Sequence, residues 1–352
     1  MGKQDKVRVA LIGIGSWAGV IANAVQRSRK LEMATCYSRN PEKRAAFSAK
    51  YGCDQEKSFE DVIKRGDVDG VLLTTPNNIH AEHAILAAKH GKHVYVEKPI
   101  ANTMADGRKM VATCRDAGVT LLVGHDMRRL SGFRKMKEMI DQGAIGKPVM
   151  VEANFSARLG FELTPDKWRY YGDDSGCPAG ALMTMGIHHA DTLAYYFGPV
   201  EKVFSFFSKL YITADVEDVE MTSCRFASGV LGHLGSTYAS PRANWIRAYG
   251  TDGHLICTLG LPNLPFDEYL KVWSVVDKYT LLQLFGKGKD DLETIPLAVG
   301  DPILEEVDEF ADCIRTGKKP ETDGEGALAA LAFIRAAIES AHTEKAVDLK
   351  SL

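Results

Sequence analysis

The chain has 352 residues, of which 45% are hydrophobic and 25% charged; this composition is typical of a globular protein, and the length predicts two domains. A formal net charge of −3 without any basic tract argues against nucleic acid or an anionic membrane surface as a partner. Seven cysteines without a Cys-x-x-Cys pair argue against a disulfide framework or a zinc site and favour a reducing compartment, so we expect no metal.

The polar first residues, 1–6, contain no signal peptide, and no apolar run reaches the length of a membrane span. We therefore expect a cytoplasmic protein that makes no membrane contact.

Short apolar strands alternate with helices in the first third of the chain. The expected strands are residues 7–12, 31–37, 69–74, 93–97 and 119–123. The expected helices are residues 17–28, 80–90 and 103–116, with another that opens at Asn40-Pro41. This alternation predicts an α/β fold, with a doubly wound parallel sheet of the Rossmann type as a dinucleotide-binding domain over residues 1–128.

The pattern changes after residue 128. A helix is expected at 133–141, and strands then dominate, at 149–157, 202–209, 219–226, 230–238, 246–249 and 254–259. Two helices, 303–315 and 326–341, close the chain, whereas residues 261–300 give no clear pattern. We predict an α+β domain with a largely antiparallel, open sheet over residues 129–352 for substrate binding and oligomerisation, with the last helix packed back on the N-terminal domain.

A glycine-rich turn joins the first expected strand to the first expected helix. Its sequence is Gly13-Ile14-Gly15-Ser16-Trp17-Ala18. The first glycine permits a tight turn, the second lets the backbone approach a pyrophosphate, and Ala18 takes the packing position of a third. The helix start then offers free N–H groups to phosphates. We predict that Gly13, Gly15, Ser16 and Trp17 bind a dinucleotide, although glycine pairs also end strands for turn reasons alone.

Polar residues gather where the other parallel strands end, which is the edge where ligands of such sheets bind. They are Ser38-Arg39, Thr75-Pro76-Asn77, Glu97-Lys98-Pro99 and Gly124-His125. Each could be ordinary loop chemistry, but together they favour a cofactor crevice. No carboxylate ends the second strand, where an NAD site usually has one, and Ser38 with Arg39 suits a 2′-phosphate. The sequence therefore favours NADP(H), with NAD(H) as the alternative.

Two further segments indicate chemistry, Glu97-Lys98-Pro99 after a strand and Gly186-Ile187-His188-His189-Ala190-Asp191 at the start of a helix. With them the sequence resembles the glucose–fructose oxidoreductase and inositol dehydrogenase (Gfo/Idh/MocA) family over nearly its whole length. Supporting matches are Thr75-Pro76-Asn77 with His80, Trp168-Arg169, and Pro320-Glu321-Thr322-Asp323-Gly324-Glu325. The resemblance implies that His80, Trp168 and Arg169 join the cofactor site, that the Lys98–Pro99 peptide is cis, and that the protein is a homodimer or homotetramer.

The resemblance also implies a catalytic set. Lys98 would hydrogen-bond the substrate oxygen and His188 would act as general base. Asp191 shares a helix face with His188, and either orients the imidazole or stabilises the first helical turn. Sugar-oxidising relatives usually have Asp four residues before this histidine, but this chain has Thr184, whose hydroxyl can hydrogen-bond but cannot accept a full proton.

The function expected from these observations is hydride transfer between a nicotinamide and a sugar, polyol or related cyclic alcohol or carbonyl. Two alternatives stay open at this stage. One is an NAD-dependent glycosidase with a transient redox step, and the other is a non-catalytic sensor of the dinucleotide. The strand at 230–238 carries Leu, His and Tyr in a two-sided pattern that a monomer would expose, which favours self-association.

Overall fold

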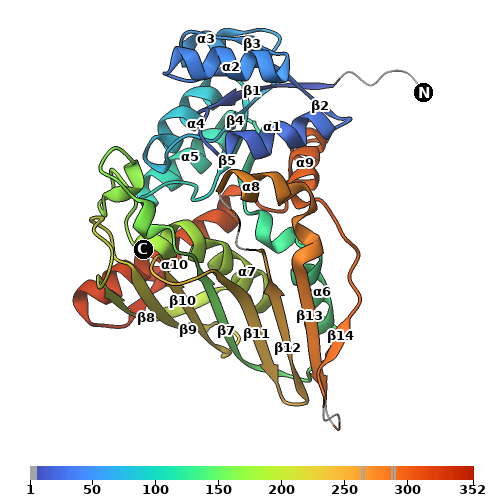
Figure 1. Cartoon of the computed structure of the whole chain (residues 1–352), viewed down its shortest axis with the longest axis vertical. Helices are drawn as coiled ribbons and strands as arrows, with labels where there is room; N and C mark the ends of the chain where they lie inside the picture. Colours follow the sequence, from blue (N-terminus) through green and yellow to red (C-terminus); the bar gives the residue numbers. More distant parts are fainter. Residues whose placement is uncertain (1–5, 263, 265, 287, 289–290) are drawn as a thin grey trace.

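The computed structural model describes residues 6–262, 264, 266–286, 288 and 291–352, so the polar segment 1–5 lies outside the described residues. The first sheet has six parallel strands in the order β3-β2-β1-β4-β5-β6 (Figure 1). They are β1 Val7–Ile12, β2 Leu31–Tyr37, β3 Asp54–Gln55, β4 Gly70–Leu73, β5 His93–Glu97 and β6 Leu121–Gly124. This is the doubly wound order, and it confirms the predicted fold class of the first sheet.

Five helices connect these strands, and all but the third begin within one residue of their predicted starts. They are α1 Ala18–Arg27, α2 Pro41–Tyr51, α3 Phe59–Lys64, α4 His80–Lys89 and α5 Met104–Asp116. The side chains of Asn40 and Thr103 accept hydrogen bonds from backbone N–H groups of the first turns of α2 and α5. The sequence analysis missed β3 and α3, because β3 has two exposed residues and α3 only six, too few for a periodic pattern.

The second sheet has nine strands in the order β14-β13-β12-β11-β7-β10-β9-β8-β15. They are β7 Pro148–Ser156, β8 Val200–Ser208, β9 Val219–Phe226, β10 Leu231–Thr237, β11 Ala243–Gly250, β12 Gly253–Leu259, β13 Thr280–Gly286, β14 Glu293–Ile295 and β15 Val347–Asp348. β7 and β10 pair in parallel, and every other pair that the structure describes is antiparallel, as predicted for most of this sheet. The segment without a clear pattern contains α8 Phe266–Lys271, the 3₁₀ turns Val272–Tyr279, β13 and β14.

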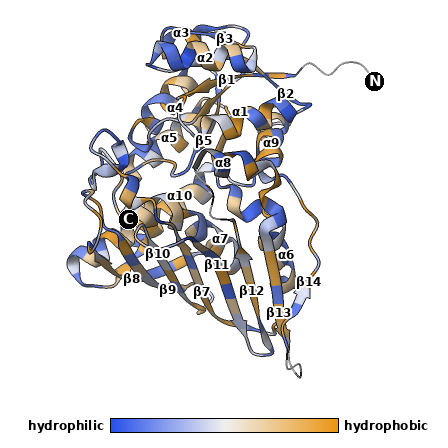
Figure 2. Ribbon diagram, in the orientation of Figure 1, coloured by the Kyte–Doolittle hydropathy of each residue, from blue (hydrophilic) through white to orange (hydrophobic). Residues whose placement is uncertain are grey.

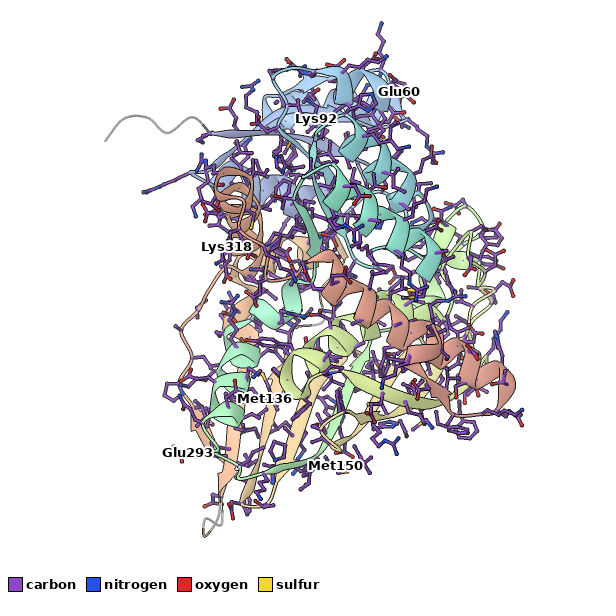
Figure 3. All side chains as sticks on the ribbon, turned by 180° about the vertical axis from the view of Figure 1, so that it is seen from behind. Glu60, Lys92, Met136, Met150, Glu293 and Lys318 are labelled. Atoms are coloured by element: carbon purple, nitrogen blue, oxygen red, sulfur yellow. The ribbon has the colours of Figure 1, made fainter. Side chains whose placement is uncertain are left out.

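Helices cover one face of the second sheet. α6 Ser131–Asp141, α7 Ile187–Phe197 and α10 Gly324–Thr343 lie in front of the strands in Figure 3, where Met136 marks α6 and Met150 marks the start of β7. α10 also contacts α5 and β6 of the first sheet, and α9 Pro302–Thr316 packs against α1 and β2. The junction between the two sheets is therefore built from both ends of the chain.

The opposite face of the second sheet, seen in Figure 1, carries no helix among the described residues. Its strands show alternating polar and apolar colours in Figure 2. Several of its apolar side chains are exposed: Phe206 by 66%, Leu231 by 55% and Met221 by 51%. The expectation for Tyr238 was wrong, because this side chain is only 1% exposed and lies outside β10, at the junction. No helix in the described ranges combines the length and apolar character that a bilayer span needs.

Candidate active site

The glycine-rich turn after β1 packs directly against the end of β4. Gly13 has φ of +91°, and a Cβ there would lie 2.9 Å from the backbone of Thr75, so only glycine fits. A Cβ on Gly15 would meet nothing within 4 Å, and Ser16 beside it is exposed. The turn thus has one glycine fixed by protein contact and another that borders open space, an arrangement that a pyrophosphate could occupy.

The end of β4 supplies polar atoms that have no partner in the described structure. Thr75 Oγ1 and Asn77 Nδ2 are both buried and unpartnered. Buried polar atoms are nearly always hydrogen-bonded, so two orphans beside an open glycine turn indicate a polar ligand. The residues present therefore fit a bound dinucleotide.

His80 lies at the first position of α4, and its ring joins two of the predicted cofactor segments. Its Nδ1 is 2.9 Å from the carbonyl oxygen of Pro99, and its Nε2 is 2.8 Å from that of Thr75. The ring is fully buried, and burial lowers the pKa of His80 to about 4. The structure thus places His80 behind the loops, where it holds Thr75-Pro76 and the Lys98–Pro99 peptide together. That peptide is cis, as the resemblance implied.

The end of β2 carries the predicted 2′-phosphate residues. Arg39 is exposed, and the carbonyl oxygen of Ser38 accepts a hydrogen bond of 2.9 Å from Nη1 of Arg44. Arg44 also donates to Gln55 on β3. Arg44 therefore supports the end of the strand, while the guanidinium of Arg39 faces solvent.

Glu97 and Trp17, both predicted to bind cofactor, bind each other. Nε1 of Trp17 donates to Oε1 of Glu97 over 2.7 Å, and the hydroxyl of Tyr95 donates to the same oxygen over 3.0 Å. Tyr95 is also 2.9 Å from Oε2 of Glu306 on α9. Burial raises the pKa values of Glu97 and Glu306. The sequence analysis missed Tyr95 and Glu306, because one reads as a strand interior and the other as a helix surface position.

Lys98 reaches from the end of β5 into the second half of the molecule. Its Nζ donates a 2.8 Å hydrogen bond to the backbone carbonyl oxygen of Thr184. Burial and the neighbouring Arg169 lower the pKa of Lys98, whereas Glu97 and Asp126 raise it. Thr184 lies four residues before His188, so this hydrogen bond brings Lys98 to the same junction as His188.

Thr184 lies in a short π-helical segment, Leu182–Gly186, which leads into α7. Its hydroxyl donates to the carbonyl oxygen of Gly180 and hydrogen-bonds the hydroxyl of Tyr238. Gly180 has φ of +34°, and a Cβ there would lie 2.4 Å from the carbonyl oxygen of Glu217. Such π-helical segments occur frequently at functional sites. Here the backbone carbonyl of Thr184 binds Lys98, while its hydroxyl is hydrogen-bonded to Gly180 and Tyr238.

His188 is 5% exposed and faces a carboxylate that the sequence analysis did not consider. Its Nδ1 lies 3.3 Å from Oδ1 of Asp126, in the 3₁₀ turn Asp126–Arg129 after β6. The polar residues predicted at this strand end were Gly124-His125, and Asp126 is the residue that follows them. His189 is buried against Phe155 and hydrogen-bonds the carbonyl oxygen of Asn154, as expected for a structural residue.

Neither of the two roles considered for Asp191 fits the structure. Its carboxylate accepts two hydrogen bonds from the guanidinium of Arg128, one of them 2.7 Å from Nε. Both side chains are buried. Asp191 is therefore a partner of Arg128, not of the His188 imidazole.

Trp168 and Arg169 lie in the 3₁₀ turn Trp168–Tyr170, in a long connection between β7 and α7. The Arg169 guanidinium stacks 4.5 Å from the Trp168 ring centroid. Its charge acts on Lys98 and on Tyr238, so this turn borders the same junction. Nowhere in the described ranges do three or more His, Cys, Asp or Glu side chains form a group that could hold a metal ion.

Comparison with known proteins gives matches over both halves of the chain. The model of the oxidoreductase family with an NAD-binding Rossmann fold matches residues 7–125, and the GFO/IDH/MocA C-terminal domain matches residues 133–256. A 1,5-anhydro-D-fructose reductase from Ensifer adhaerens is 28% identical over 348 residues, which cover 98% of this chain and 99% of the reductase.

Two further proteins are more similar in sequence. A myo-inositol 2-dehydrogenase from Thermotoga maritima is 31% identical over 84% of this chain and 85% of its own length. The crystal structure of a putative NADPH-dependent oxidoreductase from Desulfitobacterium hafniense is 36% identical, with 99% of each chain covered and a TM-score of 0.92. Together with the glycine turn and the lysine–histidine junction, these matches establish that the chain belongs to the Gfo/Idh/MocA family of oxidoreductases with an NAD-binding Rossmann fold.

Proposed function

We propose that this protein is a dehydrogenase or reductase that interconverts a secondary alcohol and a carbonyl on a sugar, polyol or related cyclic substrate. The observation that carries the proposal is the convergence of Lys98 and His188 beside the edge of the first sheet, through the hydrogen bond from Lys98 to Thr184. When bound, a nicotinamide supplies the hydride acceptor or donor. The glycine turn, Thr75 and Asn77 hold the dinucleotide.

Two side chains of the junction handle the substrate oxygen. The Lys98 ammonium hydrogen-bonds this oxygen and stabilises the negative charge that develops on it in the transition state. His188 transfers the hydroxyl proton, since an imidazole that burial keeps neutral can accept it.

The substrate class rests on the relatives, whose names include an anhydro-sugar ketone reductase and an inositol dehydrogenase. Absorbance of reduced nicotinamide is measured with 1,5-anhydro-D-fructose, myo-inositol and a series of aldoses, each with both cofactors. We expect a stoichiometric change with at least one of them. Release of an aglycone from a glycoside without any net change in that absorbance would contradict the proposal and select the glycosidase alternative.

We further propose a preference for NADP(H), supported by the exposed Arg39 at the end of β2. A planar guanidinium binds a phosphate through two charge-assisted hydrogen bonds. Replacing Arg39→Ala should weaken NADPH binding by about 10- to 100-fold and leave NADH binding unchanged, because only NADPH has the 2′-phosphate. Tighter binding of NADH than of NADPH by the unmodified protein would refute the preference.

The uncovered face of the second sheet supports a homodimer or homotetramer in which a second copy covers it. Phe206 lies opposite Met221 on the neighbouring strand, and Leu231 lies opposite Met150. A mass in solution of one 38.6 kDa chain would refute self-association. Phe206→Asp should shift an oligomer toward the monomer, whereas Lys147→Asp at an exposed loop position serves as the charge control.

Six buried cysteines and one half-buried, all free, accord with a cytoplasmic location.

A further inference from the structure

Several polar atoms at the junction are buried and have no hydrogen-bond partner in the described structure. Among them are Oδ1 and Oδ2 of Asp126 and Nδ1 of His188. Asp126 is 3% exposed and His188 is 5% exposed. The nearest pair of these atoms is 3.3 Å apart, at ion-pair distance but without hydrogen-bond alignment. Because buried polar atoms are rarely left unpaired, such a group marks a place where a proton can be exchanged.

Several charged and titratable side chains face Asp126 from β5, the 3₁₀ turn, α7 and α9. They are Tyr95, Glu97, Lys98, Arg129, His188 and Glu306. Three carboxyl groups, including Asp126, thus lie near the cations Lys98 and Arg129, and Arg129 also forms ion pairs with Glu305, Glu309 and Glu321. Carboxylates therefore outnumber cations here when all of them are ionised, so the cluster favours retention of a proton.

We propose that Asp126 and His188 form a dyad that holds one proton, whose position decides which imidazole nitrogen is free toward the substrate. The proposal rests on the proposed alcohol–carbonyl chemistry but names a residue that the family resemblance did not supply. His188 would contact the substrate oxygen, and Asp126 would act through it as a positioning and proton-holding residue.

The proposed proton balance uses the 3.3 Å separation between Nδ1 of His188 and Oδ1 of Asp126 as the transfer path, once the two groups align. With Asp126 ionised, Nδ1 of His188 carries a proton toward Oδ1, and Nε2 is free to accept. On alcohol oxidation the substrate O–H proton passes to Nε2, while the Nδ1 proton passes to Oδ1 of Asp126. The C–H electron pair leaves as hydride to the nicotinamide, and the proton on Asp126 is later released to water. Carbonyl reduction runs the same transfers in reverse, with Nε2 donating.

The pKa shifts of the two groups favour the carboxylate of Asp126, rather than the imidazole of His188, as the group that holds the proton. Burial, assisted by Glu97, raises the pKa of Asp126 to about 7. Burial and the charge of Lys98 hold the pKa of His188 well below its usual value. The two groups titrate as one coupled pair. Thr184, one turn before His188, cannot take this role, because a hydroxyl does not accept a full proton at neutral pH.

The first test reads the tautomer of His188 without any substrate. Protein labelled with ¹⁵N-histidine is followed by NMR from pH 5.5 to 8.5, and His188→Gln assigns the signals. We expect the His188 nitrogens to change from Nε2–H at low pH to Nδ1–H at high pH, with a midpoint near 7. In Asp126→Asn the step should vanish, because the amide does not titrate. An unmodified protein without this step, or a variant that retains it, would overturn the proposal.

The second test uses 1,5-anhydro-D-fructose reduction with NADPH, or whichever substrate of the panel turns over. Asp126→Asn should lower kcat by at least about 10²-fold while KM and the Kd of NADPH change less than threefold. The pH profile of the residual activity should lose its limb near pH 7. A kcat within threefold of the unmodified enzyme would refute the role of Asp126. Since the NMR step needs no turnover, failure of the proposed reaction would leave that step intact, which separates the two hypotheses.

Discussion

Two buried aspartates at the junction differ in whether a counter-charge binds their carboxylate. Asp191 is 2% exposed and forms a two-pronged ion pair with Arg128. Asp126 is 3% exposed and has no hydrogen-bond partner for its side chain among the described residues. The two carboxyl groups are almost equally buried, and burial disfavours a charged carboxylate. For Asp191 the ion pair with Arg128 offsets this cost, whereas for Asp126 burial raises the pKa. We infer that Asp191 holds the junction together and that Asp126 serves its chemistry.

The largest effects should be losses of kcat on substitution of the residues that we place in the chemical step. Lys98→Met and His188→Ala should each lower kcat by about 10²- to 10⁴-fold, because the first removes charge stabilisation and the second proton transfer. The Kd of NADPH, measured by fluorescence, should change less than threefold, since neither side chain belongs to the glycine turn. Turnover close to that of the unmodified enzyme in either variant would remove that residue from the chemistry.

Asp191→Asn should act on stability instead. Loss of the carboxylate leaves the buried Arg128 guanidinium without its counter-charge, and breaking such a pair costs about 3–5 kcal/mol. We expect a lower denaturation midpoint and a kcat per folded molecule within threefold of the original. Should Asp191→Asn unfold normally and lose activity, the comparison between the two aspartates would fail.

Asp126→Asn is the matched substitution, and we expect it to stabilise the protein, whereas Asp191→Asn should destabilise it. The carboxyl of Asp126 has a folded pKa of about 7, whereas an unfolded aspartate has a pKa of about 3.9. Between these values the folded state retains a proton that the unfolded state loses, so this group lowers the free energy of unfolding as pH rises.

Removal of that carboxyl should therefore stabilise the protein increasingly toward high pH. The gain of Asp126→Asn over the unmodified chain should grow by about 2–3 kcal/mol between pH 5 and pH 8. Urea unfolding at both values measures it. A gain that is equal at the two pH values would show that Asp126 does not titrate in this window.

The first sheet could be predicted almost strand by strand, because buried parallel strands read as apolar runs and caps such as Asn40 and Thr103 mark the helix starts. The glycine turn was predicted from its local pattern, and Lys98 and His188 were proposed from the family resemblance of the short motifs around them. Each of these signals is contained in a few consecutive residues.

The rest of the site depends on contacts between distant segments. Asp126 and His188 are 62 positions apart by their numbers, and Tyr95 meets Glu306 across 211 residues. No period or spacing encodes such pairs, so the sequence placed Asp191 beside His188 by helix position alone. The structure instead turns Asp191 toward Arg128 and brings Asp126 to the imidazole.

The smallest effect should come from the Thr184 side chain, although its backbone is central to the junction. The hydroxyl of Thr184 is occupied by the carbonyl oxygen of Gly180 and by Tyr238, whereas Lys98 uses the backbone carbonyl. Thr184→Val keeps the shape and that carbonyl, so it should cost about 1 kcal/mol of stability and change kcat less than tenfold. A loss of activity as large as that of His188→Ala would instead place the hydroxyl in contact with substrate. The same assay on Tyr238→Phe, which removes only the hydroxyl's partner, distinguishes a substrate contact from a disturbed hydrogen-bond pair.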